Sequence, residues 1–148
     1  MLKFALKSSD VRSNWSSFVD EVLFKSPKFV QRNERDTFLC INQEMLGLLL
    51  ENLRYNVSIE KDKEKEEYIA SSNQVWIVEA GKTQEDAIQT FLESYLEWAQ
   101  DYFVEFNTNF NAPNTKEQFP YVLKALLLKD VKLLREYTDV SAGTVTDN

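Results

Sequence analysis

Apolar and polar residues repeat with two different periods along the first third of the chain. Residues 2–6 alternate, which predicts a short strand. Apolar residues between 11 and 22 recur at spacings of three and four, which predicts a helix with one apolar face. Two apolar runs, 29–31 and 37–41, predict strands joined by a polar turn, and residues 43–54 predict a second helix. The expected order is strand, helix, strand, strand, helix.

A second group of strands and helices is expected after residue 55. Three strands are expected at residues 57–59, 68–70 and 75–78. A long helix follows to about residue 106, then a polar loop at 107–114 and a last helical region at 120–137. The tail, residues 141–148, is expected to be disordered. The fold class is therefore α+β, with a small antiparallel sheet and a helical C-terminal region.

Four positions carry local signals for helix starts and turns. Asn42 and Thr83 are expected to cap the helices that follow them, because both offer a side-chain oxygen to free backbone N–H groups. Ser8 and its neighbours offer the same for the first helix. Gly81 is expected in a turn with positive φ.

The composition disfavours catalysis. The chain has 148 residues, no His, one Cys and three Gly. Without His there is no imidazole base or metal ligand, and Cys40 has no partner to activate it. In the charged run at 60–67, Asp62, Glu64 and Glu66 could bind a hard cation, but the Gly and spaced terminal Glu of a calcium loop are missing. We expect a binding protein with no catalytic residue, no metal and no cofactor.

No segment predicts a membrane or a secretion signal. The longest nearly apolar run, residues 45–50, falls far short of the roughly 20 residues that span a bilayer. Residues 1–7 alternate apolar with basic residues and build no apolar block. With a lone cysteine as well, a cytoplasmic protein is expected.

The net charge of −7 is unevenly distributed. Residues 1–41 hold seven basic and five acidic residues, a net of +2, whereas residues 42–148 hold ten basic and nineteen acidic residues, a net of −9. Such asymmetry is typical of two surfaces with different partners, but chance segregation of solvated charge gives the same pattern. Both interpretations remain open on composition alone.

Basic residues gather around the start of the first helix. Arg12 and Asn14 lie where the helix dipole and free N–H groups favour phosphate. Further cations extend the cluster: Lys3, Lys7, Lys28, Arg32 and Arg35. These residues indicate either a nucleic-acid surface or a helix start with ordinary surface charge.

The same residues carry a resemblance to a known family. The pattern Arg12-x-Asn14-Trp15-Ser16, the run 27–32 that begins with Pro and ends with Arg, and the run 37–42 with the helix after it resemble Phd/YefM-family antitoxins. The similarity covers about residues 1–54. It implies a homodimer that binds operator DNA and neutralises a toxin with the segment beyond this unit. Transferred by position, the DNA-binding candidates are Arg12, Asn14 and Arg32, with Lys28, Arg35 and Lys7 as weaker ones.

The turn between the two strands departs from the family pattern. The turn of this chain is Asn33-Glu34-Arg35-Asp36, where the family usually has Gly and often Pro, so Glu34 and Asp36 bring negative charge beside the candidate phosphate contacts.

A shorter pattern at 68–71 and 81–87 looks like the strand and helix start of HicB-type antitoxins, although any capped helix after a turn would suit it.

Four carboxylates form a row on the predicted long helix. Glu93, Glu97, Asp101 and Glu105 recur every four residues, so they lie on one face. Like charges at this spacing destabilise a helix by about 0.2–0.5 kcal/mol per pair. A basic partner would relieve the repulsion, and RelE-like toxins are small and basic. The alternative is a solvated face without a partner.

These observations predict three parts and one function. Residues 1–54 form a dimerisation and DNA-binding unit, residues 55–138 a folded toxin-binding region, and residues 139–148 a disordered tail. The chain is expected to be an antitoxin, not an enzyme, that binds a basic RelE-like or Doc-like toxin and represses its own operon. The alternative is a cytosolic dimeric scaffold or regulatory module without DNA binding.

Overall fold

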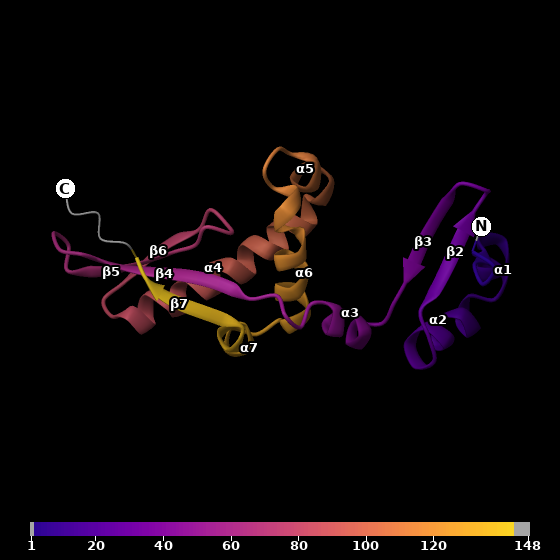
Figure 1. The fold of residues 1–148 in the computed structure, drawn as a ribbon, viewed down its shortest axis with the longest axis horizontal. Helices are drawn as coiled ribbons and strands as arrows, with labels where there is room; N and C mark the ends of the chain where they lie inside the picture. The colour runs from indigo at the N-terminus through magenta and orange to yellow at the C-terminus, as the bar shows by residue number, and fades with distance from the viewer. Residues whose placement is uncertain (1, 144–148) are drawn as a thin grey trace. The chain divides into compact units, whose positions relative to one another are not determined.

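The computed structural model describes residues 2–143, which divide into two compact units, Met1–Glu51 and Asn52–Asn148. We call them unit 1 and unit 2 and describe each by itself (Figure 1). The division falls three residues before the boundary predicted from the sequence. Each unit contains strands and helices, so the α+β class is confirmed.

Unit 1 combines a three-stranded sheet with three short helices. Its elements are β1 (Leu6–Lys7), α1 (Ser8–Ser13), α2 (Trp15–Phe24), β2 (Lys28–Arg32), β3 (Asp36–Cys40) and α3 (Gln43–Leu49). The strand order is β1-β2-β3, with β1 parallel and β3 antiparallel to β2. A small core forms where the helices meet the sheet, and it consists of Val11, Phe18, Val22 and Val30.

The first predicted helix is in fact two helices. Asn14 separates α1 from α2 with φ −126° and ψ 39°, outside the helical region. Its side-chain amide donates to the carbonyl oxygen of Asp10 at 3.1 Å, and Lys7, not a serine, occupies the N-cap of α1 without a side-chain cap bond. Asn42 does cap α3, since its Oδ1 accepts the N–H of Met45 at 2.8 Å. α3 ends at Leu49, earlier than expected.

Unit 2 consists of a four-stranded sheet covered by helices. Its elements are β4 (Tyr55–Asp62), β5 (Glu67–Ser71), β6 (Val78–Gly81), α4 (Gln84–Val104), α5 (Phe106–Asn111), the 3-10 turn η1 (Lys116–Gln118), α6 (Phe119–Leu128), α7 (Val131–Glu136) and β7 (Thr138–Ala142). The strand order is β6-β5-β4-β7. Residues 107–111, expected in a loop, belong to α5, where the N–H of Asn109 donates to the carbonyl oxygen of Glu105 at 3.0 Å.

β7 corrects two predictions. It pairs in parallel with β4, with Val140 beside Val57, so the sheet is mixed and not purely antiparallel. Residues 139–142 of the predicted disordered tail are therefore ordered by backbone pairing, and residues 144–148 lie outside the described residues. Figure 1 shows β7 directly beside β4.

α4 supplies most of the core of unit 2. Thr83 caps it as predicted, with Oγ1 accepting the N–H of Asp86 at 3.0 Å. One face of the helix is buried against the sheet and α6, and it comprises Ala87, Ile88, Phe91, Leu92, Tyr95, Ala99 and Tyr102. Alternate residues of β4 face it, Tyr55, Val57 and Ile59, as the two-residue period of a strand requires.

A buried lysine joins three segments of unit 2. Lys124, on α6, is only 3% exposed. Its Nζ donates to the carbonyl oxygen of Leu53 at 2.7 Å and lies 3.5 Å from the centre of the Tyr137 ring. A hydrogen bond and a cation–π contact together offset the desolvation of the ammonium group. Lys124 thereby holds the segment before β4 and the segment before β7 against α6.

Gly81 has a different role from the one predicted. It ends β6, and no glycine in the described residues has positive φ. A Cβ at this position would collide with the backbone nitrogen of Ala87 in the first turn of α4. The glycine is therefore needed for close approach of two backbones, because only a residue without a side chain leaves room.

We expect Gly81→Ala to destabilise unit 2 by about 1–3 kcal/mol, since the collision is with backbone that cannot move aside. Urea unfolding followed by circular dichroism measures the loss. Gly47→Ala is the matched control: nothing lies within 4 Å of a Cβ there, so alanine should leave α3 unchanged or stabilise it. Equal effects of the two substitutions would contradict the steric explanation.

The ion pair between Arg54 and Asp139 predicts a pH dependence. Two bonds join them, Nε to Oδ2 at 3.1 Å and Nη2 to Oδ1 at 2.8 Å. The hydrogen bond from Arg54 lowers the pKa of Asp139 below its ordinary 3.8. The pair therefore stabilises the folded protein above that value, and its contribution is lost as the pH falls through the lowered pKa. NMR titration of the Asp139 carboxyl carbon should give a midpoint below 3.8, and Arg54→Gln should return it toward 3.8.

Candidate functional site

Three of the predicted DNA-binding residues lie at one end of the unit 1 sheet. Lys7 is the last residue of β1 and pairs with Gln31. Arg32 ends β2 beside it, and Arg35 lies in the turn that follows. Two shallow hollows open here: one is lined by Ala5, Lys7, Ser8, Ser9, Gln31, Asn33 and Glu34, the other by Arg32, Arg35, Asp36, Thr37 and Phe38. Glu34 and Asp36 thus share these hollows with the cations.

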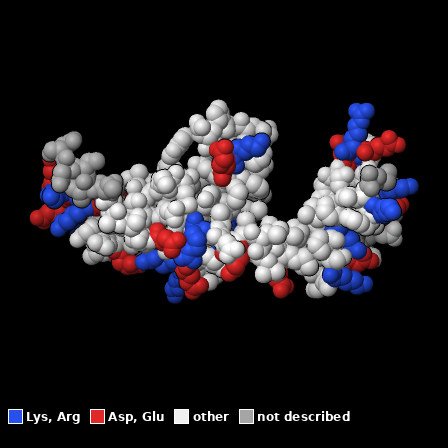
Figure 2. Space-filling model, viewed as in Figure 1, with Lys and Arg blue, Asp and Glu red and all other residues white. Residues whose placement is uncertain are grey.

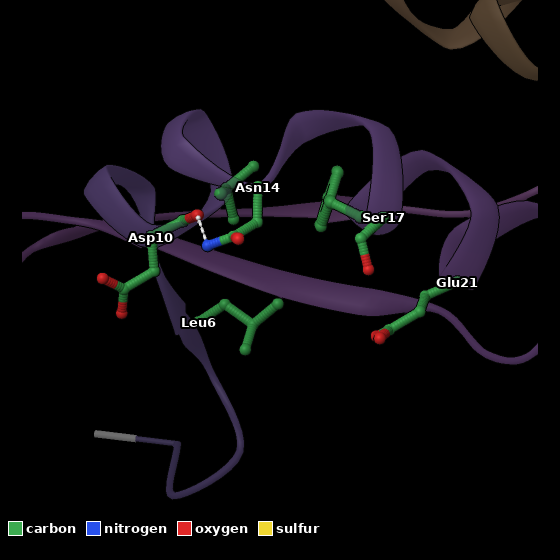
Figure 3. A pocket seen from close by; sticks show the side chains of 7 residues that line it. Leu6, Asp10, Asn14, Ser17 and Glu21 are labelled. Atoms are coloured by element: carbon green, nitrogen blue, oxygen red, sulfur yellow. Dashed lines mark hydrogen bonds between the residues drawn. The ribbon is translucent and has the colours of Figure 1, made fainter.

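Arg12 and Asn14 lie on the helical side of unit 1. Arg12 is exposed in the last turn of α1. Asn14 lines a pocket of about 250 Å³ together with Leu6, Asp10, Val11, Ser17, Phe18 and Glu21. Figure 3 shows its amide directed to the Asp10 carbonyl, with the carboxylates of Asp10 and Glu21 at two ends of the pocket. The polar end of Asn14 therefore stabilises the junction of the two helices.

Lys28 is separated from the other candidates. It begins β2, four residues before Arg32, which is about 13 Å along a strand. Its Nζ lies 2.9 Å from Oε2 of Glu21, and this contact lowers the pKa of that carboxyl. A phosphate contact at Lys28 would have to compete with Glu21.

Unit 1 as a whole carries no basic excess. Residues 1–51 hold seven basic and seven acidic residues, so the +2 found for residues 1–41 disappears when the unit is taken to its structural boundary. On the visible face of unit 1, Lys and Arg are interspersed with Asp and Glu (Figure 2). Any nucleic-acid contact would depend on individual residues and not on a broad positive field.

The predicted acidic row lies on the solvent side of α4. Glu93, Glu97, Asp101 and Glu105 are all exposed, and the last of them caps the C-terminus of the helix. The Gln89 amide donates to Glu93 at 2.8 Å, but within residues 2–143 none of the four forms an ion pair. No Lys or Arg occurs between residues 83 and 115, so the charges have no counterion on their own helix.

Aromatic side chains along α4 and at the start of α5 pack in or against the core of unit 2. Trp98, Tyr102 and Phe106 form successive edge-to-face contacts, with ring centres 5.6 Å and 6.2 Å apart. Phe103, in contrast, is 51% exposed, and Val104 is 79% exposed. Residues 102–104 turn through about 200° of helix, so they cannot all face one core. A run of three apolar residues in a helix therefore indicates that at least one of them is exposed.

The described residues present neither a metal site nor a membrane span. Across residues 2–143, no three His, Cys, Asp or Glu side chains are close enough together to hold a metal ion. None of the helices in this range is both long and apolar enough to span a bilayer.

Comparison with known proteins agrees with this architecture. Residues 1–140 match the family described as "PHD_like: Antitoxin of toxin-antitoxin, RelE / RelB, TA system". The chain belongs to the PHD-like antitoxin family. The match spans both units, whereas the resemblance found in the sequence rested on about residues 1–54. An antitoxin of a toxin–antitoxin system has a cognate toxin as its partner, and the family is not known for enzymes.

A crystal structure of the same type of protein shares the fold. It is described as "an antitoxin part of a putative toxin/antitoxin system" from Syntrophomonas wolfei subsp. wolfei. The TM-score is 0.87 at 29% sequence identity, and the alignment covers 94% of this chain and 99% of that one. The PHD-like antitoxin described here therefore shares nearly its whole architecture with a solved antitoxin.

A second similarity covers only part of a much longer protein. Ninety-four residues, 62% of this chain, are 28% identical to "Probable methionine--tRNA ligase, cytoplasmic" of Schizosaccharomyces pombe. The match spans 12% of that protein. The activity of the ligase does not extend to this chain on that basis.

Proposed function

We propose that this antitoxin neutralises a small basic toxin, RelE-like or Doc-like, by stoichiometric binding through unit 2. The observation that supports this most directly is the acidic face of α4, whose carboxylates are exposed and without a counterion in the described residues. Binding covers the toxin, and no chemical step is involved.

The repulsion within the acidic row favours a basic partner. Each neighbouring pair of like charges, four residues apart, destabilises the helix by about 0.2–0.5 kcal/mol. A bound cationic surface adds carboxylate–cation attractions that offset this repulsion. Opposite charge also steers the two proteins together and raises the association rate.

Unit 2 offers this face as a preformed surface. α4 is held by a buried core and capped by Thr83, so the carboxylates are already aligned before the partner arrives. Because the carboxylates are already aligned, binding costs less conformational entropy than it would for a disordered toxin-binding segment.

A homodimer through unit 1 is supported by the apolar surface of that unit. Nine large apolar side chains of unit 1 are exposed: Leu2, Phe4, Trp15, Leu23, Phe24, Phe38, Leu39, Leu48 and Leu49. Such a density of exposed apolar groups in about fifty residues is typical of a surface that another chain covers.

Operator binding and autorepression form the second half of the proposal. Lys7, Arg32 and Arg35 lie at one end of the sheet, and Arg12 is exposed on α1. A dimer would present each of them twice. A module without DNA binding is the competing function, and the neutral charge of unit 1 together with the Lys28–Glu21 pair favours it.

We expect the purified antitoxin to bind the small basic protein encoded beside its gene, and charge reversal of the acidic row to weaken that complex. Glu97→Lys with Asp101→Lys should raise Kd by roughly a hundredfold or more, since two attractions become repulsions. Isothermal titration calorimetry at 0.15 M salt measures the change.

The matched control is Glu64→Lys with Glu66→Lys, in the turn between β4 and β5, which makes the same change in net charge away from α4. An equal loss of affinity in both double variants would show that net charge alone, and not this face, holds the toxin. If the wild-type chain forms no complex with that basic protein, the proposal is overturned.

We expect DNA from upstream of the gene to be retarded by the wild-type protein in a gel-shift assay, with binding that weakens as salt increases. Arg12→Ala should weaken it by roughly tenfold, the cost of losing one charged contact. Lys132→Ala, which removes an exposed cation from α7 of unit 2, is the control and should have no effect. Failure of the wild-type protein to bind would favour the module without DNA binding.

A further inference from the structure

The C-terminal end of α4 exposes apolar side chains that the core of unit 2 does not use. Val104 is 79% exposed and Phe103 is 51% exposed, although both belong to the last turn of a helix whose opposite face is fully buried. Exposure of one apolar residue is ordinary, but here two adjacent ones are exposed at the end of the helix that carries the acidic row.

Val104 lies among the carboxylates. Asp101 precedes it by three residues and Glu97 by seven, so both share its face of the helix. Glu105 follows it directly at the C-cap. The result is an exposed apolar side chain bordered by carboxylates, and apolar contacts beside polar ones are typical of protein interfaces.

The apolar centre is rigidly supported. The ring of Phe103 packs on Phe106 with centres 5.7 Å apart. Phe106 in turn lies 5.1 Å from Phe110 and 5.3 Å from Phe119, so α4, α5 and α6 hold it in place. A partner that covers Phe103 and Val104 therefore has little side-chain motion to arrest.

We propose that this surface, formed by Glu97, Asp101, Phe103, Val104 and Glu105, binds an amphipathic helix of the toxin that carries an apolar side chain between Lys or Arg residues spaced four apart. The inference rests on the proposed function and names the part of the partner that is recognised. Carboxylates four residues apart are separated by about 6 Å along α4, the same rise that a second helix gives to cations at that spacing.

The charge of the surface decides between partners. A second copy of this chain would bring two acidic rows together, and nucleic acid would bring phosphates against carboxylates, both of them repulsive. Only a cationic partner gains from the rim, and only an apolar side chain gains from covering Val104. A basic amphipathic helix meets both conditions.

Two substitutions at Val104 separate the apolar contact from the electrostatic one. Val104→Arg removes the apolar group and adds a repulsive charge, whereas Val104→Glu removes the apolar group but adds an attractive one. With the purified basic protein encoded beside the gene as the probe, we expect both to raise Kd by at least about tenfold, Arg more than Glu. Because the side chain is exposed, both variants should keep the wild-type Tm.

Val78→Arg is the matched control, since Val78 is 64% exposed in β6 of the same unit, and it should leave Kd unchanged. If Val104→Glu binds as tightly as the wild-type chain, or tighter, the apolar centre is wrong and only the acidic row acts. If Val78→Arg weakens binding as much as Val104→Arg, the toxin does not bind specifically at the surface around Val104, although the proposed function stands. If the wild-type chain does not bind, the proposed function and this inference fall together.

Discussion

A helix of 21 residues that lies on a sheet must bury one side and leave the other in water, and unit 2 depends on this division of α4. The buried side contributes seven residues to the core. Its packing fixes the rotation of the helix about its own axis. That rotation directs Glu93, Glu97 and Asp101 into solvent. The stability of the unit and the position of its acidic surface are therefore two results of one packing arrangement.

The features that hold α4 in place are spread along the chain. Gly81 allows β6 to meet the first turn of the helix, and Lys124 ties α6, which packs on α4, to the segments before β4 and β7. Neither residue belongs to the exposed surface. Both residues affect the acidic surface indirectly, by fixing the position of α4. A shift of this helix relative to the sheet would move every carboxylate together.

Local signals in the sequence predicted the caps of α3 and α4, but not the start of α1, where Lys7 and not a serine lies at the N-cap. Asn42 and Thr83 cap helices as predicted, since capping involves residues three positions apart. The acidic row was predicted because helix geometry alone places residues four apart on one face. The parallel pairing of β7 with β4 joins residues about eighty positions apart and leaves no local trace, so that strand was taken for tail. The role of Gly81 was misread because it depends on how closely the first turn of α4 approaches β6, which residue type alone does not show.

The parallel pairing of β7 also fixes the order in which the protein can be completed during synthesis. Unit 1 consists of residues 1–51 and can fold while the rest of the chain is still being made. β4 is synthesised soon afterwards, but one of its edges stays unpaired until residues 138–142 emerge. A chain that stops after α6 would therefore lack β7 and leave one edge of β4 open. The sheet on which α4 packs is complete only once residues 138–142 have been made.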